Sequence, residues 1–198
     1  MRFIIYLFLL LFCACSLRTV NMNVSDYAQW VRDPENGLNK TKQLGDYIFS
    51  AQYKPREMVA LLEFGKDADP SSSEFKTRVS NLGQMEYFTF TISTVKGLEV
   101  LSNNIANEGE FFGRLEYFLE HGQEAFSLIA GEDTLPCRFY HFERTYGLSP
   151  NTNILLGFEN IGKCTSDIVI QYEDILLGVG PVNITYDIDD LKEIPKLK

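Results

Sequence analysis

Residues 135–146 hold the most chemically reactive side chains of the sequence, namely Cys137, His141 and Glu143. On a strand these three side chains would share one face, because side chains alternate between the two faces. His141 and Glu143 could then supply two metal ligands, and Cys137 and His141 could form a nucleophile–base pair. The sequence offers no third partner for either arrangement. We therefore favour an ordinary strand whose polar groups are hydrogen-bonded to its neighbours.

The common enzyme motifs are missing from the sequence: there is no Gly-x-Ser-x-Gly, no His-Glu-x-x-His, no Walker loop and no Gly-x-Gly-x-x-Gly. Only His121 and His141 could serve a His-dependent site. The acidic run at Asp187, Asp189 and Asp190 lacks the Gly and the distal Glu of a calcium-binding loop. Helix capping explains it better, since Asp187 could cap a last short helical turn through Leu191. We therefore expect no catalytic residue, no metal site and no cofactor.

The N-terminus predicts that the chain is exported. Arg2 precedes an unbroken apolar run of ten residues, Phe3 to Phe12. Such a run is too short to span a bilayer as a helix, and its length is typical of the core of a signal peptide.

Ala14-Cys15 follows this run, and a small residue before a cysteine at this point resembles the lipobox of bacterial lipoproteins. The resemblance implies that residues 1–14 are a signal peptide that is removed, and that lipid on Cys15 then anchors the protein to a membrane. Phe12 and Cys13 depart from the residues usual in this motif. An ordinary secretory signal is the alternative, although its small-x-small cleavage site is hard to place here.

The mature chain has the composition of one folded, acidic domain. We assign residues 15–24 to the lipidated cysteine and a short tether, and residues 25–198 to a single globular domain. The chain is 45% hydrophobic and 23% charged, which is too apolar for a disordered segment. Without Arg2 it has 17 Lys and Arg against 27 Asp and Glu, a formal charge of −10. This charge disfavours binding to nucleic acid.

Alternation of apolar and polar residues predicts an α+β fold with a mostly antiparallel β-sheet. In the clearest strand, 87–94, Phe88, Phe90 and Ile92 alternate with hydroxyl-bearing residues. Helices are expected at 25–31, 55–65, 71–83 and 108–121, and the other strands at 40–44, 47–53, 124–130, 135–145, 152–159, 166–174 and 181–187. We expect the helices to pack on one face of the sheet, with a helix-decorated β-sandwich as the alternative.

Cys137 and Cys164 are the thiols of the mature domain besides Cys15. In an oxidising periplasm, a disulfide between Cys137 and Cys164 would close a loop of about 28 residues and stabilise the fold by about 3 kcal/mol. Two independent buried thiols are the equal alternative.

The segment 175–181 is unusually apolar for a connection between two strands. It has no charge and contains four aliphatic residues, Ile175, Leu176, Leu177 and Val179, whereas connections are usually polar. Leu176 and Leu177 could fold back onto the end of the core. Alternatively the loop could form an exposed tip that docks on a partner or touches the membrane, which makes Leu176, Leu177 and Val179 a candidate binding loop.

Short motifs spread over nearly all of the mature chain resemble a group of small uncharacterised lipoproteins of Bacteroidota-type bacteria. These motifs are Gln29–Leu38, Gln52–Pro55, Asp133–Cys137, His141–Arg144, Tyr146–Leu148 and Ile194–Lys198. The resemblance implies a location in the cell envelope and no particular activity. In such bacteria acidic residues just after the lipidated cysteine usually direct a lipoprotein to the cell surface. Residues 16–19 contain none, which implies the periplasmic face of a membrane, expected to be the outer membrane.

Three functions are compatible with these features. The first is a non-enzymatic envelope lipoprotein that binds a partner protein or scaffolds an assembly. The second is a lipoprotein that binds a small ligand or glycan through exposed aromatic residues. The third, an enzyme centred on His141, is the least favoured. A pocket with convergent polar groups would support the second or third function, and an apolar surface patch would support the first.

Overall fold

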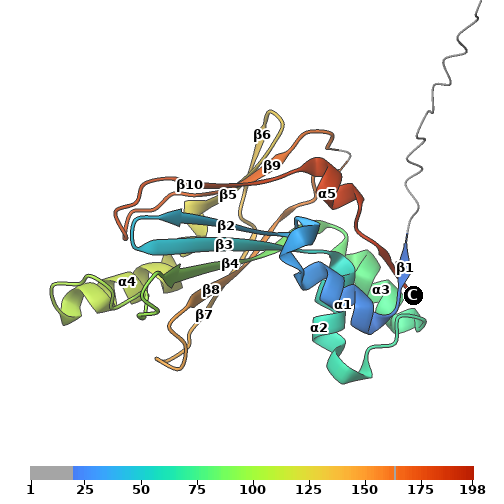
Figure 1. Ribbon diagram of the computed structural model, residues 1–198, viewed down its shortest axis with the longest axis horizontal. Coiled ribbons are helices and arrows are strands. Elements are labelled where there is room, and N and C mark those ends of the chain that lie inside the picture. Colours follow the sequence, from blue (N-terminus) through green and yellow to red (C-terminus); the bar gives the residue numbers. More distant parts are fainter. Residues whose placement is uncertain (1–19, 163) are drawn as a thin grey trace, which may run out of the picture.

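Two antiparallel sheets lie face to face at the centre of the fold (Figure 1). The structure is a computed structural model and describes residues 20–162 and 164–198, so the predicted signal peptide 1–14 and Cys15 lie outside the described residues. The larger sheet has the strand order β2 (Asn39–Leu44), β3 (Tyr47–Lys54), β4 (Met85–Thr94), β8 (Thr152–Glu159), β7 (Phe139–Glu143). The smaller sheet has the order β10 (Val182–Tyr186), β9 (Ile168–Tyr172), β5 (Phe126–Ala130), β6 (Asp133–Pro136).

Aromatic side chains from both sheets fill the space between them. Tyr172 of the smaller sheet packs against Phe49 and Phe90 of the larger sheet, with ring centroids 6.1 and 5.5 Å apart. Phe126 meets Phe90 edge-on at 5.1 Å. The hydroxyl of Tyr186 also crosses between the sheets, donating a hydrogen bond of 2.6 Å to the carbonyl of Ala51. The two sheets therefore share one hydrophobic core.

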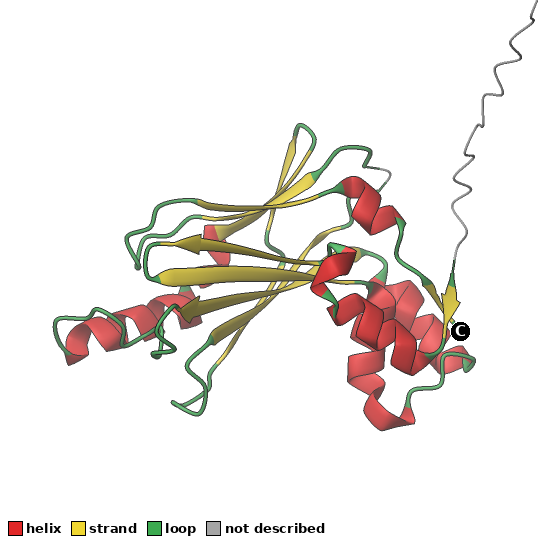
Figure 2. Cartoon of the chain, viewed as in Figure 1, coloured by secondary structure: helices red, strands yellow, loops and turns green. Residues whose placement is uncertain are grey.

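The helices lie mainly at the two ends of this sandwich (Figure 2). At one end are α1 (Val24–Arg32), α2 (Arg56–Phe64) and α3 (Ser73–Leu82), together with the short α5 (Ile188–Lys192). The first three surround a second, smaller core that includes Tyr27, Met58 and Phe75. The helix α4 (Glu108–Glu120) lies at the other end, where Phe118 stacks on Phe142 at 5.5 Å. The described residues also form the 3-10 turns η1 (Pro34–Asn36), η2 (Gly65–Asp67) and η3 (Gly122–Ala125).

Local capping signals set several helix starts. The side chain of Asn23 accepts a hydrogen bond from the Asp26 amide at the start of α1. Ser72 accepts one from the Phe75 amide in α3. The N-cap is therefore Ser72, one residue after the start of the helix expected at 71–83. Each cap satisfies an amide that has no partner within its helix.

The predicted α+β class with mostly antiparallel sheet is confirmed. Within that class the two sheets enclose a common core, which is the arrangement of the helix-decorated sandwich that the sequence left open. The expected strand 152–159 is β8, and the expected strands 40–44 and 47–53 are β2 and β3, which pair as a hairpin. Their boundaries agree because alternation and turn residues are local signals.

The expected strand 135–145 is wrong, since it divides into β6 and β7, which belong to different sheets. The change occurs at Cys137 and Arg138. The amide of Cys137 donates to the carbonyl of Phe126 in the smaller sheet, and that of Arg138 donates to the carbonyl of Gly157 in the larger sheet. Pro136 has no amide hydrogen to continue the β6 ladder.

The folded domain begins earlier than the predicted boundary at residue 25. The strand β1 (Asn21–Met22), which the sequence assigns to the tether 15–24, pairs in parallel with β11 (Lys196–Leu197). The side chains of Met22 and Leu197 pack against the helical core. A two-residue strand is too short for a periodic pattern, and its partner lies at the far end of the sequence.

Among residues 20–162 and 164–198, no helix is both long and apolar enough to cross a membrane.

We expect replacement of Tyr186 with Phe to destabilise the sandwich, because the ring remains but the buried hydrogen bond to Ala51 is lost. The free energy of unfolding should fall by about 1 kcal/mol, the typical net value of such a bond. Tyr146→Phe is the matched control, since the Tyr146 side chain is 76% exposed. Denaturant titration of both variants measures the difference, and equal stabilities would contradict the role assigned to the Tyr186 hydroxyl.

Candidate functional site

The residues singled out for chemistry do not converge on one site. His141 is exposed, whereas Cys137 is buried in the shared core with its thiol directed at the carbonyl of Phe139, 3.0 Å away. Glu143 accepts a hydrogen bond of 3.1 Å from the side chain of Asn153 on the neighbouring strand. Within the part of the chain that the structure describes, no group of three or more His, Cys, Asp or Glu side chains could hold a metal ion. Within β7, Glu143 therefore contacts the neighbouring strand, whereas the Tyr140 hydroxyl donates to the carbonyl of Phe118 in α4.

Cys137 and Cys164 are both free thiols in the structure. Burial raises the pKa of Cys137 to about 11, so this thiol stays protonated at neutral pH and is a poor nucleophile. Cys164 is half-buried, with its sulfur 3.3 Å from the carbonyl of Ser166. A bridge between the two cysteines under oxidising conditions stays a prediction.

The apolar loop between β9 and β10 folds around the side chain of Asp174. Its carboxylate accepts hydrogen bonds from the amides of Leu176, Leu177 and Val179 at 3.1, 2.9 and 2.9 Å. The side chains of these three residues are half-buried and pack against the shared core. Ile175 points the other way, with 70% of its surface exposed. The loop therefore seals the end of the core and leaves one aliphatic side chain in solvent.

Exposed apolar side chains occur on several segments at the end of the sandwich farthest from β1, the end at which Figure 1 shows α4. Strand register places the loops after β4 and between β7 and β8 at the same end of the larger sheet, and Figure 1 shows the connection between β9 and β10 at that end. The helix α4 joins them, because Ile175 and Tyr117 line one shallow groove. The exposed side chains, here called the distal surface, are Val95, Leu98, Phe112, Tyr146, Leu148 and Ile175.

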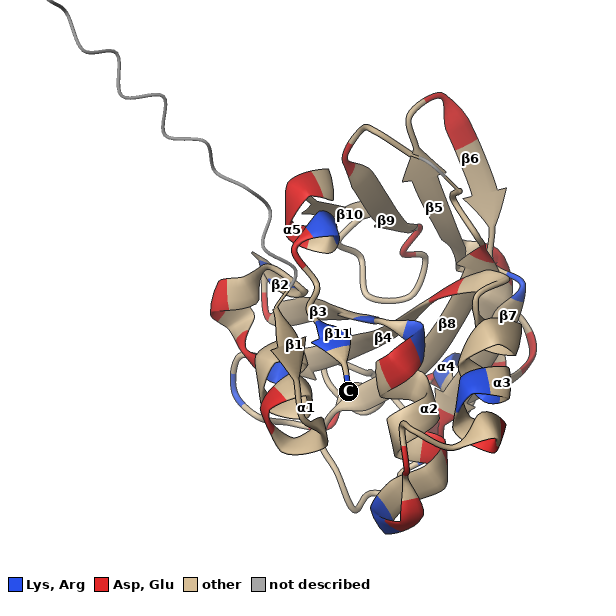
Figure 3. Cartoon of the chain, turned by 90° about the vertical axis from the view of Figure 1, so that its right-hand side faces the viewer, with Lys and Arg blue, Asp and Glu red and all other residues tan. Residues whose placement is uncertain are grey.

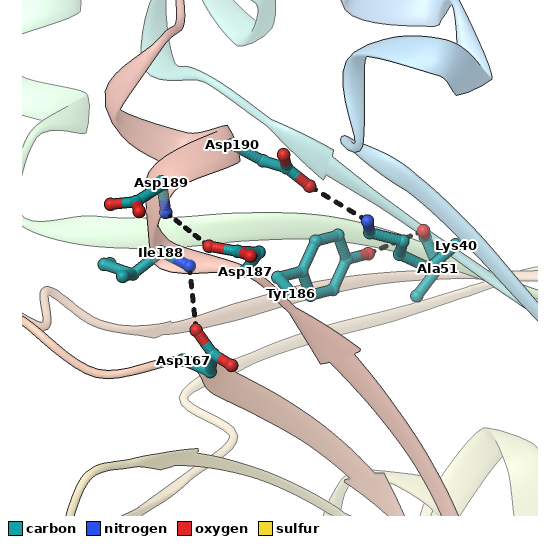
Figure 4. Close-up of polar contacts among 8 residues, drawn as sticks. All are labelled: Lys40, Ala51, Asp167, Tyr186, Asp187, Ile188, Asp189 and Asp190. Carbon is teal, nitrogen blue, oxygen red and sulfur yellow. Dashed lines mark hydrogen bonds and ion pairs between the residues drawn. The ribbon is translucent and has the colours of Figure 1, made fainter.

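The acidic residues around α5, at the opposite end, have structural partners (Figures 3 and 4). Asp187 caps α5 by accepting a hydrogen bond from the Asp189 amide at 2.8 Å, as the sequence predicts. Asp167 accepts one from the Ile188 amide, and Asp190 pairs with Lys40 at 2.9 Å. These contacts attach α5 to both sheets, so the acidic cluster is explained by the fold.

A polar cleft of about 470 Å³ lies beside the helical end of the larger sheet. Glu86 near the start of β4 lines it and is only 7% exposed. One carboxylate oxygen of Glu86 accepts a hydrogen bond from the Tyr53 hydroxyl at 2.7 Å, and the other accepts one from the Asn160 side chain at 2.8 Å. Burial and the charge of Glu86 raise the pKa of Tyr53 well above its ordinary value, so its hydroxyl keeps its proton and donates.

Sequence reasoning missed this cleft, although one signal was available. Alternation along β4 puts Glu86 on the same inward face as Phe88 and Phe90, where a carboxylate is out of place. Tyr53 and Asn160 come from separate strand ends and have no sequence pattern that links them to Glu86.

Comparison with known proteins adds no relative. The chain matches no protein family, no curated protein and no solved structure. The distal surface and the cleft beside Glu86 are therefore judged on their geometry alone.

We expect the double substitution Leu176→Ser, Leu177→Ser to lower the free energy of unfolding by about 2 kcal/mol, near the lower end for core truncations because both side chains are half-buried. Ile175→Ser is the matched control in the same loop and should change stability by less than about 0.5 kcal/mol. Thermal or denaturant unfolding tests this difference. A double variant as stable as the control would mean that the leucines do not seal the core.

Proposed function

We propose that this protein is a lipid-anchored protein of a bacterial envelope whose folded domain binds a partner protein and has no catalytic role. The anchor is lipid on Cys15, which the lipobox-like Ala14-Cys15 after the apolar run supports. The absence of acidic residues in 16–19 supports a position on the periplasmic face of the outer membrane. The resemblance to small lipoproteins of Bacteroidota-type bacteria supports the same compartment.

The observation that carries the partner-binding role is the position of the distal surface. The strand β1, through which the chain leads toward Cys15, lies at one end of the sandwich, and the distal surface lies at the other (Figure 1). Single exposed apolar residues are common on proteins, whereas several from separate segments at one end of a domain make that end a candidate interaction site. A protein anchored at β1 would present this surface away from its own membrane.

The charges around the distal surface favour a partner protein whose contact surface combines apolar and basic residues. Exposed carboxylates on α4 and nearby segments outnumber exposed cations there. The carboxylates are Glu108, Glu110, Glu116, Glu120, Glu124 and Glu173, and the cations are Lys96 and Arg144. Arg144 is already placed over the ring of Tyr146, 4.5 Å from its centroid. An anionic membrane or a second copy of this acidic chain would meet repulsion at this surface.

One feature favours the second candidate, a lipoprotein that binds a small ligand or glycan. That feature is the polar cleft beside Glu86, where polar groups from three segments converge. The cleft lies at the helical end, away from the distal surface, so ligand binding and partner binding are compatible.

Lipidation is tested by growing cells with a labelled fatty acid. We expect the wild-type protein to carry the label and Cys15→Ser to lack it, because the thiol is the site of acylation. Cys13→Ser is the matched control and should remain labelled, since Cys15 and Ala14 are intact. Equal labelling of wild type and Cys15→Ser would contradict the anchor.

The distal surface is tested with the triple substitution Phe112→Ser, Leu148→Ser, Ile175→Ser. A photoreactive residue at Tyr146 in living cells identifies the neighbouring protein, which is then purified and bound to the full mature protein. We expect the triple variant to bind it at least about tenfold more weakly, because apolar contacts at the centre of an interface dominate affinity. Added salt should weaken binding by the wild type, since the partner is expected to be basic.

Leu62→Ser is the control for this experiment, because Leu62 is 50% exposed on α2 at the helical end. It should bind the partner as the wild type does. Sedimentation tests whether a second copy of the chain occupies the distal surface, and vesicle flotation tests whether a membrane does. A dimer that the triple substitution dissociates would show that the occupant is a second copy. Flotation that the triple substitution abolishes would show that the occupant is a membrane.

A further inference from the structure

Glu86 is a buried carboxylate with no counter-charge. Among residues 20–162 and 164–198, no Lys, Arg or His side chain forms an ion pair with it. Its hydrogen bonds from Tyr53 and Asn160 come from neutral donors. A carboxylate has about four acceptor positions, so these two bonds leave Glu86, which lines the cleft, with further acceptor capacity. Because a buried charge is costly unless it is paired, a cationic group in the cleft would stabilise Glu86.

Two cations line other parts of the same cleft. Arg56, the first residue of α2, extends over Gly83, where an added Cβ would lie 2.8 Å from the Arg56 guanidinium. Its contact with Glu57 is long, at 3.4 Å, and its side chain is half-exposed. Lys196 contributes from β11, which pairing with β1 holds in place. The cleft therefore presents the carboxylate of Glu86 at its buried side, and the exposed cations Arg56 and Lys196 together with Glu57 elsewhere in its lining.

We propose that this cleft binds a small zwitterion of the amino acid or dipeptide class, with the ligand ammonium at Glu86 and its carboxylate at Arg56 and Lys196. The volume of about 470 Å³ is within the range of small-molecule sites. Met85, Ile194 and Pro195 form an apolar part of the wall that contacts the ligand side chain. This inference rests on the small-ligand candidate and is independent of the distal surface.

Tyr53 and Asn160 are positioning residues in this site. Each donates to a different oxygen of Glu86 and so holds the carboxylate in one orientation. The Tyr53 hydroxyl keeps its proton and therefore acts as the donor. Its hydrogen bond to Glu86 is stronger when Glu86 is charged, because hydrogen bonds to an ionised acceptor are shorter and stronger. The ligand ammonium then meets a fixed acceptor, which reduces the entropy lost on binding.

The proposal is tested with the full mature protein in detergent and three related probes. The probes are the dipeptide Ala-Ala, its N-acetyl derivative, which lacks the ammonium, and its C-terminal amide, which lacks the carboxylate. We expect titration calorimetry to give the highest affinity for Ala-Ala, with each modified probe at least about tenfold weaker. Absence of Ala-Ala binding at millimolar concentration, or equal binding of all three probes, overturns the proposal.

Two substitutions assign the ends of the ligand. Glu86→Gln should remove the preference for Ala-Ala over the N-acetyl probe. Arg56→Gln should reduce the preference for Ala-Ala over the C-terminal amide probe. Arg56 is at an exposed position, so its replacement should not affect folding. Glu159→Gln is the matched control, since Glu159 is exposed and pairs with Arg138 outside the cleft. Binding of a neutral disaccharide such as maltose in place of Ala-Ala would overturn this inference and leave the small-ligand candidate standing.

Discussion

The two sheets bury their aromatic inner faces against each other, and the rest of the structure depends on this contact. Tyr172 stacks on Phe126 at 4.9 Å within its own sheet and packs on Phe49 and Phe90 across the core. Burial of each such side chain stabilises the fold by about 1.5–3 kcal/mol. The Tyr186 hydroxyl adds a polar tie between the sheets. Because the inner faces of the two sheets are buried against each other, the helices and loops that surround this core lie mainly at the ends of the strands.

The two ends of the sandwich have different characters for this reason. At one end, α1, α2 and α3 build a separate core, and the parallel pair β1–β11 joins the two termini of the folded domain to it. At the other end, α4 and the loop around Asp174 seal the shared core with apolar residues, some of which stay in solvent. The cleft belongs to the first end and the distal surface to the second. The strand β4 runs between them, with Glu86 near its start and Val95 just after its end.

Charge is distributed so that most acidic residues have a structural role or remain solvated. Asp187 caps α5, Asp174 orders the β9–β10 loop, and Asp190 pairs with Lys40. Glu86 differs from these carboxylates because it is buried, and its hydrogen bonds come from the side chains of Tyr53 and Asn160. This difference, together with the cavity that it lines, separates a candidate ligand site from an ordinary acidic surface.

The sequence by itself determined the elements whose signals are local. Alternation within 87–94 predicted most of β4, and the acid before the last helix predicted its cap at Asp187, because both depend on neighbouring residues. Only the tertiary structure decided that β6 and β7 belong to different sheets, that β1 pairs with β11, and that Glu86 faces a cleft. Each of these results joins segments far apart in the chain, and spacing in a single sequence carries no information on such contacts.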